Sequence, residues 1–352
     1  MLKIGIRILS IAAVFFAACA CCSTTPSEEM NIKVNRIWDS EKHCAFTSLT
    51  KFNGRYYVAF REGGGHIFEE DGSARGRIRI LESPNGRKWK SVACLAKEGY
   101  DLRDPSLSVT PDGRLLVSTG GSIYVDKKLV GRDPMYSESL DGRNFSDPEL
   151  IELNSTIATG EDWLWKVDWK GDTGYGVVYS SLEEGSENQT IVFLVKTSDG
   201  IHYEDVAKID VPGFPNEAAV HFLNDGRMLM LLRQESLDSQ AIWGVSEQPY
   251  TDWKLTKTGF QAGGPNFIIF GDSTIVAGSR SYMIPGAPKT MLLKGTPDGR
   301  FEQIAVLPSG GDTSYPGFLV VGDELWVSYY STHQTRKAAV YLARIPLKCL
   351  NL

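Results

Sequence analysis

The sequence lacks the features that mark several large classes of protein. It has only six Cys and five His among 352 residues. The three Cys that follow residue 30, Cys44, Cys94 and Cys349, have no metal-type spacing, and an odd number leaves at least one unpaired. We therefore expect no metal, no cofactor and no disulfide framework.

A basic surplus and helical patterning are also missing. The formal net charge of −6 offers no basic face for a nucleic acid, so we expect no nucleic-acid partner. A few local Arg residues could still bind an acidic substrate. After residue 30 there is no long helical periodicity, whereas 35 Gly, 14 Tyr and 15 Phe are typical of many short strands and tight turns.

The N-terminal segment has the pattern of an export signal. Lys3 and Arg7 supply positive charge, and Ile8–Ala18 is an apolar run too short to span a bilayer. The run ends in Phe16-Ala17-Ala18-Cys19, which resembles the cleavage box of bacterial lipoproteins, where the Cys is lipidated and becomes the first residue.

We accordingly expect residues 1–22 to be a lipoprotein signal and lipidation region, with lipid on Cys19, and residues 23–30 to be a polar tether. Cys21 and Cys22 are alternative lipidation sites, and an ordinary secretory signal is the alternative to a lipoprotein. The protein is expected to be exported and held to the bacterial membrane only by this lipid, on the periplasmic or the cell-surface face.

One short pattern recurs six times after this segment: a few apolar residues, a turn of Gly with Asp or Asn, and a strongly apolar strand. Such turns supply the positive φ angles that tight hairpins need. They recur about every 50 residues, the length of one four-stranded propeller blade. The turns are Asn53-Gly54, Asp112-Gly113, Gly171-Asp172, Asp225-Gly226, Gly271-Asp272 and Gly322-Asp323.

A second pattern falls roughly midway between these hairpins. It combines Ser or Thr, Asp or Asn, Gly and an aromatic residue, which together form a turn whose ring packs between strands. The copies are Ser83–Trp89, Ser139–Phe145, Thr197–Tyr203 and Thr296–Phe301, with a degenerate copy at Ser246–Trp253. They resemble the Asp-boxes of the sialidase superfamily, which are structural and identify architecture rather than chemistry.

The two repeats predict an all-β fold, a six-bladed β-propeller of four-stranded antiparallel blades over residues 31–352. Ala338–Ile345 and Ile32–Ile37 both alternate like strands, so we expect the N-terminal strand to complete the last blade and close the ring. This is one domain without a linker, and we expect a monomer.

In a propeller, the starts of the innermost strands and the loops after the second strands meet at one end of the central channel. Ionisable and aromatic residues at those positions form a candidate binding site, because such groups are costly to bury unpaired. The alternative is that they pair with one another as a structural plug. Trp163 and Trp165, taken singly, fit the core better than a sugar platform.

Two segments resemble sialidases more specifically. Asn216-Glu217-Ala218-Ala219-Val220, with Arg233 beyond it, is similar to the family segment that carries a Glu and a later Arg. Ser314-Tyr315-Pro316-Gly317 is similar to the segment that presents the nucleophilic Tyr. The resemblance implies that Glu217 stabilises Tyr315 and that Arg233 binds a substrate carboxylate. Arg280 or Lys289 falls where another carboxylate-binding Arg is expected.

The sequence departs from the family in the first blade. The family's opening Phe/Tyr-Arg-Ile-Pro motif is replaced by His43-Cys44-Ala45-Phe46, so its leading Arg is missing, although Arg61 or Arg103 could replace the charge. The acid/base Asp has no clear match in the loop 63–73, and Asp104 and Glu62 are rival candidates. A glycan other than a sialoside is therefore the better expected substrate.

Together these features predict an exo-acting glycoside hydrolase that removes a terminal sugar, acidic or neutral, from a glycan. Tyr315 and Glu217 would form the nucleophile pair and Asp104 the acid/base. The predicted substrate-binding residues are Arg61, Glu62, His66, Arg103, Trp163, Lys166, Asn266, Arg233, Arg280, Tyr330 and His333. Two alternatives remain: a uronate polysaccharide lyase in which Tyr315 or His66 abstracts a proton, and a surface protein that binds glycan without catalysis.

Overall fold

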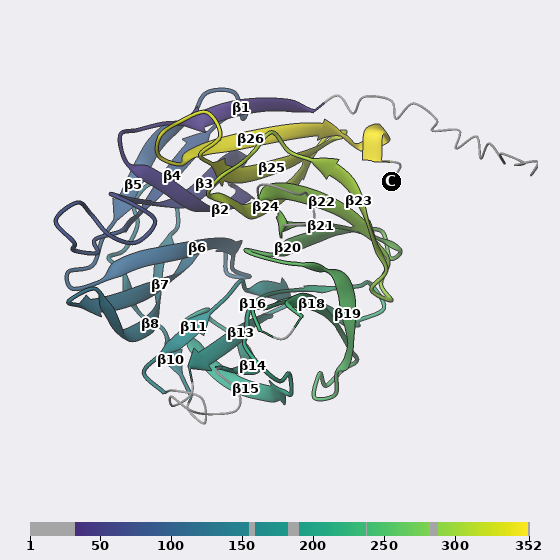
Figure 1. Cartoon of the computed structure of the whole chain (residues 1–352). Coiled ribbons are helices and arrows are strands. Elements are labelled where there is room, and N and C mark those ends of the chain that lie inside the picture. The colour runs from purple at the N-terminus through teal and green to yellow at the C-terminus, as the bar shows by residue number, and fades with distance from the viewer. Residues whose placement is uncertain (1–31, 155–158, 182–189, 237, 282–287, 351–352) are drawn as a thin grey trace, which may run out of the picture. The chain divides into compact units, whose positions relative to one another are not determined.

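A computed structural model describes residues 32–154, 159–181, 190–236, 238–281 and 288–350. These residues belong to one compact unit, in which six sheets surround a central axis (Figure 1). The predicted six-bladed propeller is thereby confirmed. In the described part of the chain, no helix is long and apolar enough to cross a membrane. The predicted signal, the tether and the lipidation site at Cys19, like Cys21 and Cys22, lie outside the described residues.

The first three blades each run from an inner strand to an outer strand. Blade one contains β2 (His43–Phe52), β3 (Arg55–Gly63), β4 (Arg77–Ser83) and β5 (Lys90–Leu95). Blade two contains β6 (Asp101–Val109), β7 (Leu115–Val125), β8 (Lys128–Ser139) and β9 (Glu149–Leu150). Blade three contains β11 (Asp162–Leu164) and β12 (Asp168–Lys170) in the inner position, then β13 (Thr173–Ser181), β14 (Thr190–Thr197), β15 (His202–Ile209) and the parallel edge strand β10 (Glu152–Leu153).

The remaining blades repeat this order. Blade four contains β16 (Pro215–Phe222), β17 (Met228–Gln234), β18 (Gln240–Ser246) and β19 (Lys254–Gln261). Blade five contains β20 (Asn266–Phe270), β21 (Thr274–Ser281), β22 (Lys289–Gly295) and β23 (Phe301–Val306). Blade six contains β24 (Thr313–Val321), β25 (Glu324–Ser331), β26 (Ala339–Pro346) and β1 (Lys33–Trp38), and the 3-10 helix η1 (Leu347–Leu350) follows β26.

The N-terminal strand closes the ring as expected. β1 lies antiparallel to β26, with Lys33 opposite Arg344 and Trp38 opposite Val340. The first and last strands of the propeller therefore share one blade, which ties its two ends together by backbone hydrogen bonds (Figure 1).

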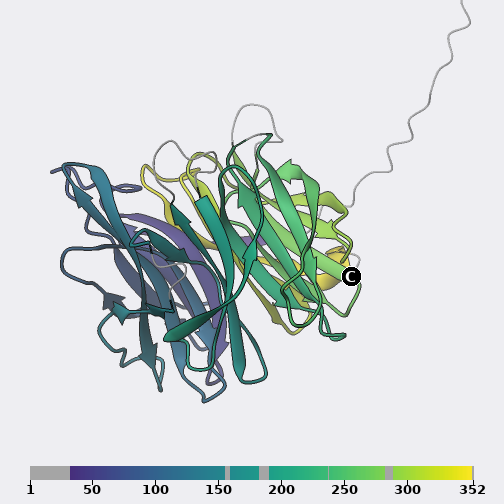
Figure 2. The same ribbon diagram turned by 90° about the horizontal axis from the view of Figure 1, so that it is seen from below.

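Apolar side chains from neighbouring blades fill the space between them. Tyr57 and Ile78 of blade one pack with Leu115 and Val117 of blade two, and all four are fully buried. Burying one such side chain stabilises a fold by about 1.5–3 kcal/mol. The blades are thus held through their faces, as the apolar strands after each hairpin predict. Figure 2 shows the same blades from below, after a 90° turn.

The second sequence pattern forms the expected turns between the third and fourth strands of a blade. In the turn after β14, Gly200 has a φ of 81° and donates its N–H to the Thr197 hydroxyl at 2.8 Å. Asp199 Oδ1 accepts the N–H groups of Ile201 and His202 at 2.8 and 2.9 Å. The turn is closed by its own side chains.

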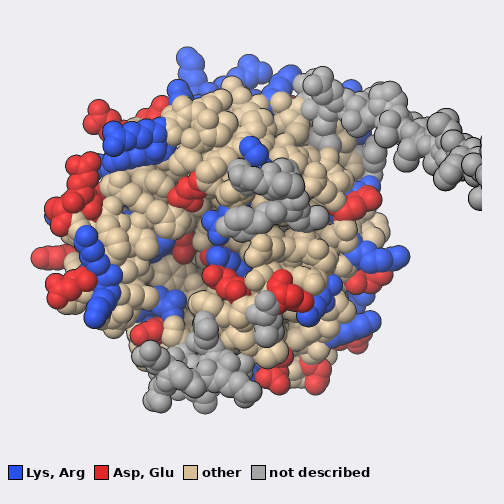
Figure 3. Space-filling model, in the orientation of Figure 1, with Lys and Arg blue, Asp and Glu red and all other residues tan. Residues whose placement is uncertain are grey.

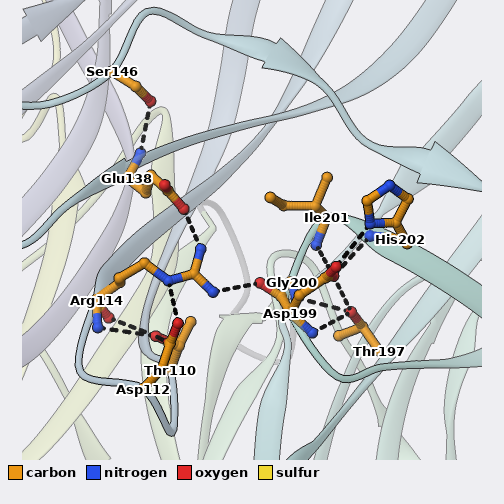
Figure 4. Close-up of polar contacts among 10 residues, drawn as sticks. All are labelled: Thr110, Asp112, Arg114, Glu138, Ser146, Thr197, Asp199, Gly200, Ile201 and His202. Atoms are coloured by element: carbon orange, nitrogen blue, oxygen red, sulfur yellow. Dashed lines mark hydrogen bonds and ion pairs between the residues drawn. The ribbon is translucent and has the colours of Figure 1, made fainter.

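Neighbouring blades are joined through these turns. Arg114, at the start of β7, donates to the carbonyl oxygen of Asp199 at 2.9 Å and to Asp112 at 2.8 Å, and it also pairs with Glu138 (Figure 4). Tyr203, the aromatic residue of this turn, is 1% exposed. These contacts give the Asp-box pattern a structural role.

The innermost strands are interrupted at matching positions, which the sequence patterns do not reveal. Four of them carry an extra residue relative to the second strand, between Ala45 and Ser48, Arg103 and Ser106, Pro215 and Ala218, and Ser314 and Gly317. In blade three the inner strand breaks between β11 and β12 instead. Bulges bend a strand and redirect its side chains.

Three of the bulged residues adopt the left-handed backbone conformation that is uncommon outside Gly: Phe46, Asp104 and Tyr315 have φ angles of 63°, 49° and 55°. Such strained conformations cluster at functional sites. The repeated bulges therefore mark one level of the channel as a candidate site.

Candidate active site

Tyr315 and Glu217 face each other from the bulges of β24 and β16. The Tyr315 hydroxyl donates a short hydrogen bond to Glu217 Oε1. Both residues are buried, with 8% and 4% of their surface exposed. Burial, together with the Glu217 carboxylate, holds the pKa of Tyr315 well above its usual value, so the free site contains a phenol rather than a phenolate.

Glu217 is held as a carboxylate by the groups around it. Arg233 Nη1 lies 2.9 Å from Oε1, and the N–H of Gly264 donates to Oε2 at 2.7 Å. Burial acts to raise the pKa of Glu217, but Arg233 and the Tyr315 hydrogen bond outweigh it, and the pKa is lowered. Glu217 is therefore ionised in the free site and accepts the Tyr315 hydrogen bond as a carboxylate.

Gly264 is required by the position of the Tyr315 ring. It has a φ of 62°, and a Cβ at this position would lie 2.4 Å from Tyr315 Cδ2. Only Gly provides both the backbone angle and the space. The loop before β20 can thus bring its N–H to Glu217 while the phenol ring lies directly against it.

Asp104 is the second carboxyl group of this level of the channel. Its Oδ1 is buried and has no hydrogen-bond partner among the described residues. Burial raises the pKa of Asp104 to about 6, although Arg103 acts to lower it, and the charge of Glu217 raises it further. Two carboxyl groups with pKa values displaced in opposite directions are typical of an acid and a base.

Lys166 enters the channel at the break between β11 and β12. Its Nζ lies 5.7 Å from the centre of the Trp165 ring. Burial lowers the pKa of Lys166 to about 8, while the charges of Asp104 and Glu217 act in the opposite direction. A cation of blade three therefore lies within electrostatic range of both carboxyl groups.

Aromatic rings surround the Tyr315 phenol. The ring centre of Phe46 lies 4.7 Å from that of Tyr315, and those of Trp165 and Tyr330 lie 5.6 and 6.0 Å away. Arg103 lies above the Phe46 ring at 5.0 Å. Phe46, in the segment that replaces the family's opening motif, thus places an apolar ring against the phenol.

A cluster of His43, His66, Asp312 and Tyr330 borders this aromatic wall. His43 Nε2 and His66 Nδ1 lie 2.9 and 2.6 Å from Asp312 Oδ2, and the Tyr330 hydroxyl donates to Oδ1 at 2.9 Å. The His66 ring also meets Phe46 edge to face at 5.1 Å. In Figure 3, Lys and Arg atoms lie beside Asp and Glu atoms near the middle of the ring.

Comparisons with solved structures show the same fold in other proteins. A protein of unknown function from Dyadobacter fermentans superposes with a TM-score of 0.76 at 18% identity, over 92% of this chain and 100% of its own. Trypanosoma rangeli sialidase superposes with a TM-score of 0.70 at 13% identity, over 89% of this chain and 59% of its own. The chain has the propeller fold of sialidases.

The NanB sialidase of Streptococcus pneumoniae matches in the same way, with a TM-score of 0.65 at 9% identity over 89% of this chain and 70% of its own. The chain spans about three fifths of the length of the Trypanosoma sialidase. No protein-family model and no curated protein matches the sequence. The likeness is one of fold.

Within the ranges that the structure describes, three predicted substrate-binding residues form no hydrogen bond with Tyr315, Glu217 or Asp104. Arg61 is fully buried and donates to Asp101, Gly65 and Ile67. Glu62 points to the other face of β3, where it accepts from Arg79 and from Trp38 Nε1.

Trp163 is only 3% exposed, and its ring packs directly on Gly120. Arg61 and Trp163 are thus buried and Glu62 pairs with Arg79, and substrate binding by these three residues stays a prediction. The rivalry of Glu62 with Asp104 for the acid/base role likewise stays a prediction.

Of two further predicted residues, Asn266 supports the site and His333 lies away from it. Asn266 donates to the carbonyl oxygen of Pro316 at 3.0 Å and so holds the bulge that carries Tyr315. It also lines a cavity of about 320 Å³ farther along the channel, together with Lys166. His333 binds the Ser331 hydroxyl and packs on Tyr341 of the third strand, away from Tyr315.

The Arg residues predicted to bind substrate have distinct surroundings. Arg233 forms ion pairs with Glu217 and Glu235, each at 2.9 Å. The backbone N–H of Arg280 donates to the Ser314 hydroxyl at 2.8 Å, beside the Tyr315 bulge, and the guanidinium of Arg280 lies against Gly263. Substrate binding by Arg103, Arg233, Arg280 and Lys166 stays a prediction.

Sequence reasoning missed Gly264 and Asp312. Gly264 belongs to no repeat pattern, and its role depends on a ring from the next blade. Asp312 lies three residues before Tyr315, and its meeting with two His of blade one follows only from closure of the ring.

Proposed function

We propose that this protein is an exo-acting glycoside hydrolase that releases a terminal sugar from a glycan. The observation that carries the proposal is the buried hydrogen bond from Tyr315 to Glu217, because an ionised Glu beside a phenol is a base positioned to activate a nucleophile. A binding protein has no need for this pair.

The first step would form a bond between Tyr315 Oη and the anomeric carbon of the sugar. Glu217 takes the phenolic proton, and Asp104 gives its proton to the oxygen of the leaving group, so the glycosidic bond breaks without free charge on either fragment. A pKa of about 6 keeps part of Asp104 protonated in weakly acidic solution.

The second step would return the site to its starting state. A water molecule attacks the anomeric carbon, Asp104 takes the proton of that water, and Tyr315 leaves and recovers its proton from Glu217. Arg233 holds Glu217 ionised in the free site, before the first step and after the second. Lys166, Arg103 and Arg280 are the cations that would hold an acidic group of the sugar.

The proposed location is the outer side of a bacterial membrane. The resemblance of Phe16-Ala17-Ala18-Cys19 to a lipoprotein cleavage box supports anchoring through Cys19, which would give the site access to extracytoplasmic glycans.

The test is to incubate the purified protein, and its Tyr315→Phe variant, with sialylated, uronic-acid-containing and neutral glycans and to weigh the products by mass spectrometry. Products that together gain one water, and that the variant fails to form, establish a Tyr-dependent hydrolase. Products that gain no water and carry an unsaturated uronate establish a lyase instead. Glycan binding without turnover, equal in both proteins, rejects catalysis.

A further inference from the structure

His43, His66 and Asp312 form a compact cluster of residue types that commonly bind metal ions. Two imidazole nitrogens converge on one carboxylate oxygen, Asp312 Oδ2. Among the described residues, no Lys or Arg forms an ion pair with this carboxylate, which is 24% exposed. A partly buried carboxylate without a cation is costly, so its charge is balanced either by a protonated imidazole or by a bound metal ion.

The geometry of the three side chains suits one metal ion. Their ligand atoms all lie within 4.8 Å of one another. Because two ligands of a tetrahedral zinc ion lie roughly 3–4 Å apart, Asp312 Oδ2 and the two imidazole nitrogens, which are at hydrogen-bond distance, would move slightly apart to admit the ion. Two His and one carboxylate are a donor set that favours Zn²⁺ and similar divalent transition metals. We propose that His43, His66 and Asp312 bind a divalent transition-metal ion beside the aromatic wall of the channel mouth.

The ligands are held in place by groups outside the cluster. Arg61 donates to the carbonyl oxygens of Gly65 and Ile67, each at 2.8 Å, and so clamps the backbone on both sides of His66. The guanidinium is itself fixed by Asp101 at 2.6 Å. Such support of a ligand-bearing loop is characteristic of built metal sites.

The carboxylate is oriented as well. Tyr330 donates to Asp312 Oδ1 and leaves Oδ2 to face the two imidazoles. The backbone N–H of Asp312 donates to the Thr332 hydroxyl at 3.0 Å. Hydrogen bonds to the outer oxygen of a ligating carboxylate fix its direction and tune its affinity for metal.

The site would be open on one side. The His66 side chain is 45% exposed, whereas that of His43 is 8% exposed. Three protein ligands leave a fourth position for water or for an oxygen of a bound molecule, as in zinc sites that act on substrates. The Phe46 ring packs against both the His66 ring and the Tyr315 ring. Metal binding here does not depend on the proposed hydrolase activity.

The sequence shows no metal motif because the three ligands come from the start of β2, the loop after β3 and the segment before β24. They meet only because blades one and six are neighbours in the closed ring.

The experiment is a titration of the chelator-treated, full-length protein with Zn²⁺ and with Co²⁺. Every protein carries Cys19→Ser, Cys21→Ser, Cys22→Ser and Cys94→Ser, because thiols outside the cluster could bind metal by themselves and Cys94 is exposed and free. The readouts are bound zinc per chain, the visible spectrum of bound Co²⁺, and the midpoint of thermal unfolding, which a ligand of the folded state raises.

We expect one zinc ion per chain. His66→Gln and Asp312→Asn should weaken binding by at least about tenfold and abolish the Co²⁺ spectrum, while Tyr330→Phe should weaken it about tenfold. His202→Gln is the matched control, because His202 also pairs with carboxylates, Asp199 and Glu152, in a surface turn far from the cluster in the sequence.

Metal-free thermal unfolding of each variant reports whether it folds, so loss of binding cannot be confused with loss of structure. The proposal is overturned if the wild type binds neither ion at micromolar concentration. It is equally overturned if His66→Gln binds as tightly as the wild type, or if His202→Gln loses the metal.

Discussion

In the turn after β14, the carboxylate of Asp199 accepts two backbone N–H groups and the hydroxyl of Thr197, whereas Asp104, in the bulge of β6, has an oxygen without a partner among the described residues. Hydrogen bonds from His202 and Ile201 hold the pKa of Asp199 below its usual range despite the opposing effect of its partial burial. Burial raises the pKa of Asp104 to about 6.

The difference separates what the repeat does from what the channel mouth does. The carboxylate of Asp199 accepts hydrogen bonds from residues next to it in the chain, so its role is local. It stays ionised at neutral pH. Asp104 is held in a left-handed backbone conformation and surrounded by charges from other blades. Groups that are costly to the fold but kept in place are candidates for chemistry.

The largest effect is expected from breaking the Tyr315–Glu217 pair. Tyr315→Phe and Glu217→Gln should each lower kcat/KM by at least about 10³-fold on the substrate found by product analysis, because each removes part of one activated nucleophile. The double variant should lose little more than either single variant. Additive losses in steady-state kinetics would show that the two residues do not act together.

Asp104→Asn should lower kcat by roughly 10²–10⁴-fold, since it removes the proton donor. In the wild type, kcat/KM should fall as pH rises through about 6, where Asp104 loses its proton. The variant should lack this dependence. A wild-type pH profile that is flat between pH 5 and 7 would argue against Asp104 as the acid.

The same substitution should stabilise the protein at neutral pH. Because the pKa of Asp104 is raised by folding, the stability it confers is present below its unfolded pKa of about 4 and is lost as pH rises through about 6. Asp104→Asn should therefore raise the thermal midpoint at pH 7.5 and leave it nearly unchanged at pH 4. A lower midpoint at pH 7.5 would mean that the ionised form is favoured.

Gly264→Ala tests the close approach of the Tyr315 ring, with Gly271→Ala as its matched control. Both positions have similar positive φ angles, 62° and 57°, but a Cβ at Gly271 meets nothing within 4 Å. Each should cost about 1 kcal/mol of backbone strain. Only Gly264→Ala should also lower turnover, and equal activity of the two variants would exclude the contact.

The smallest effect is expected at the repeat. Asp199→Ala should lower stability by about 1 kcal/mol or less at pH 7 and leave kcat/KM unchanged. Because folding lowers the pKa of Asp199, its contribution is present above its unfolded pKa of about 4 and declines as pH falls below it. The difference in unfolding midpoint between the wild type and the variant should shrink in acid. Lost activity in the variant would contradict a purely structural role for Asp199.

The blades were predictable because their signals are local. Gly54 and Gly200 take the positive φ angles that their turns demand, and closure by β1 follows from one unpaired alternating segment. Tyr315, Glu217 and Asp104 could be proposed from their place in the repeat together with the family resemblance.

The rest depends on register and on neighbouring blades. Arg61 and Glu62 are adjacent in β3 and point to opposite faces, and neither lines the mouth, since one is buried under the loop and the other pairs with Arg79. Bulges in the inner strands shift the alternation that sequence reasoning relies on. Gly264 and Asp312 act through contacts across blades, which no local pattern encodes.

The most direct measurement of the central claim, that Tyr315 is a nucleophile activated by Glu217, is covalent trapping. The protein would be treated with a fluorinated, activated glycoside of the sugar that it releases, digested, and analysed by peptide mass spectrometry. We predict that the glycosyl group is found on Tyr315, that labelling is slow in Glu217→Gln and that it is absent in Tyr315→Phe. Turnover with the label on another residue, or with no label at all, would contradict the account.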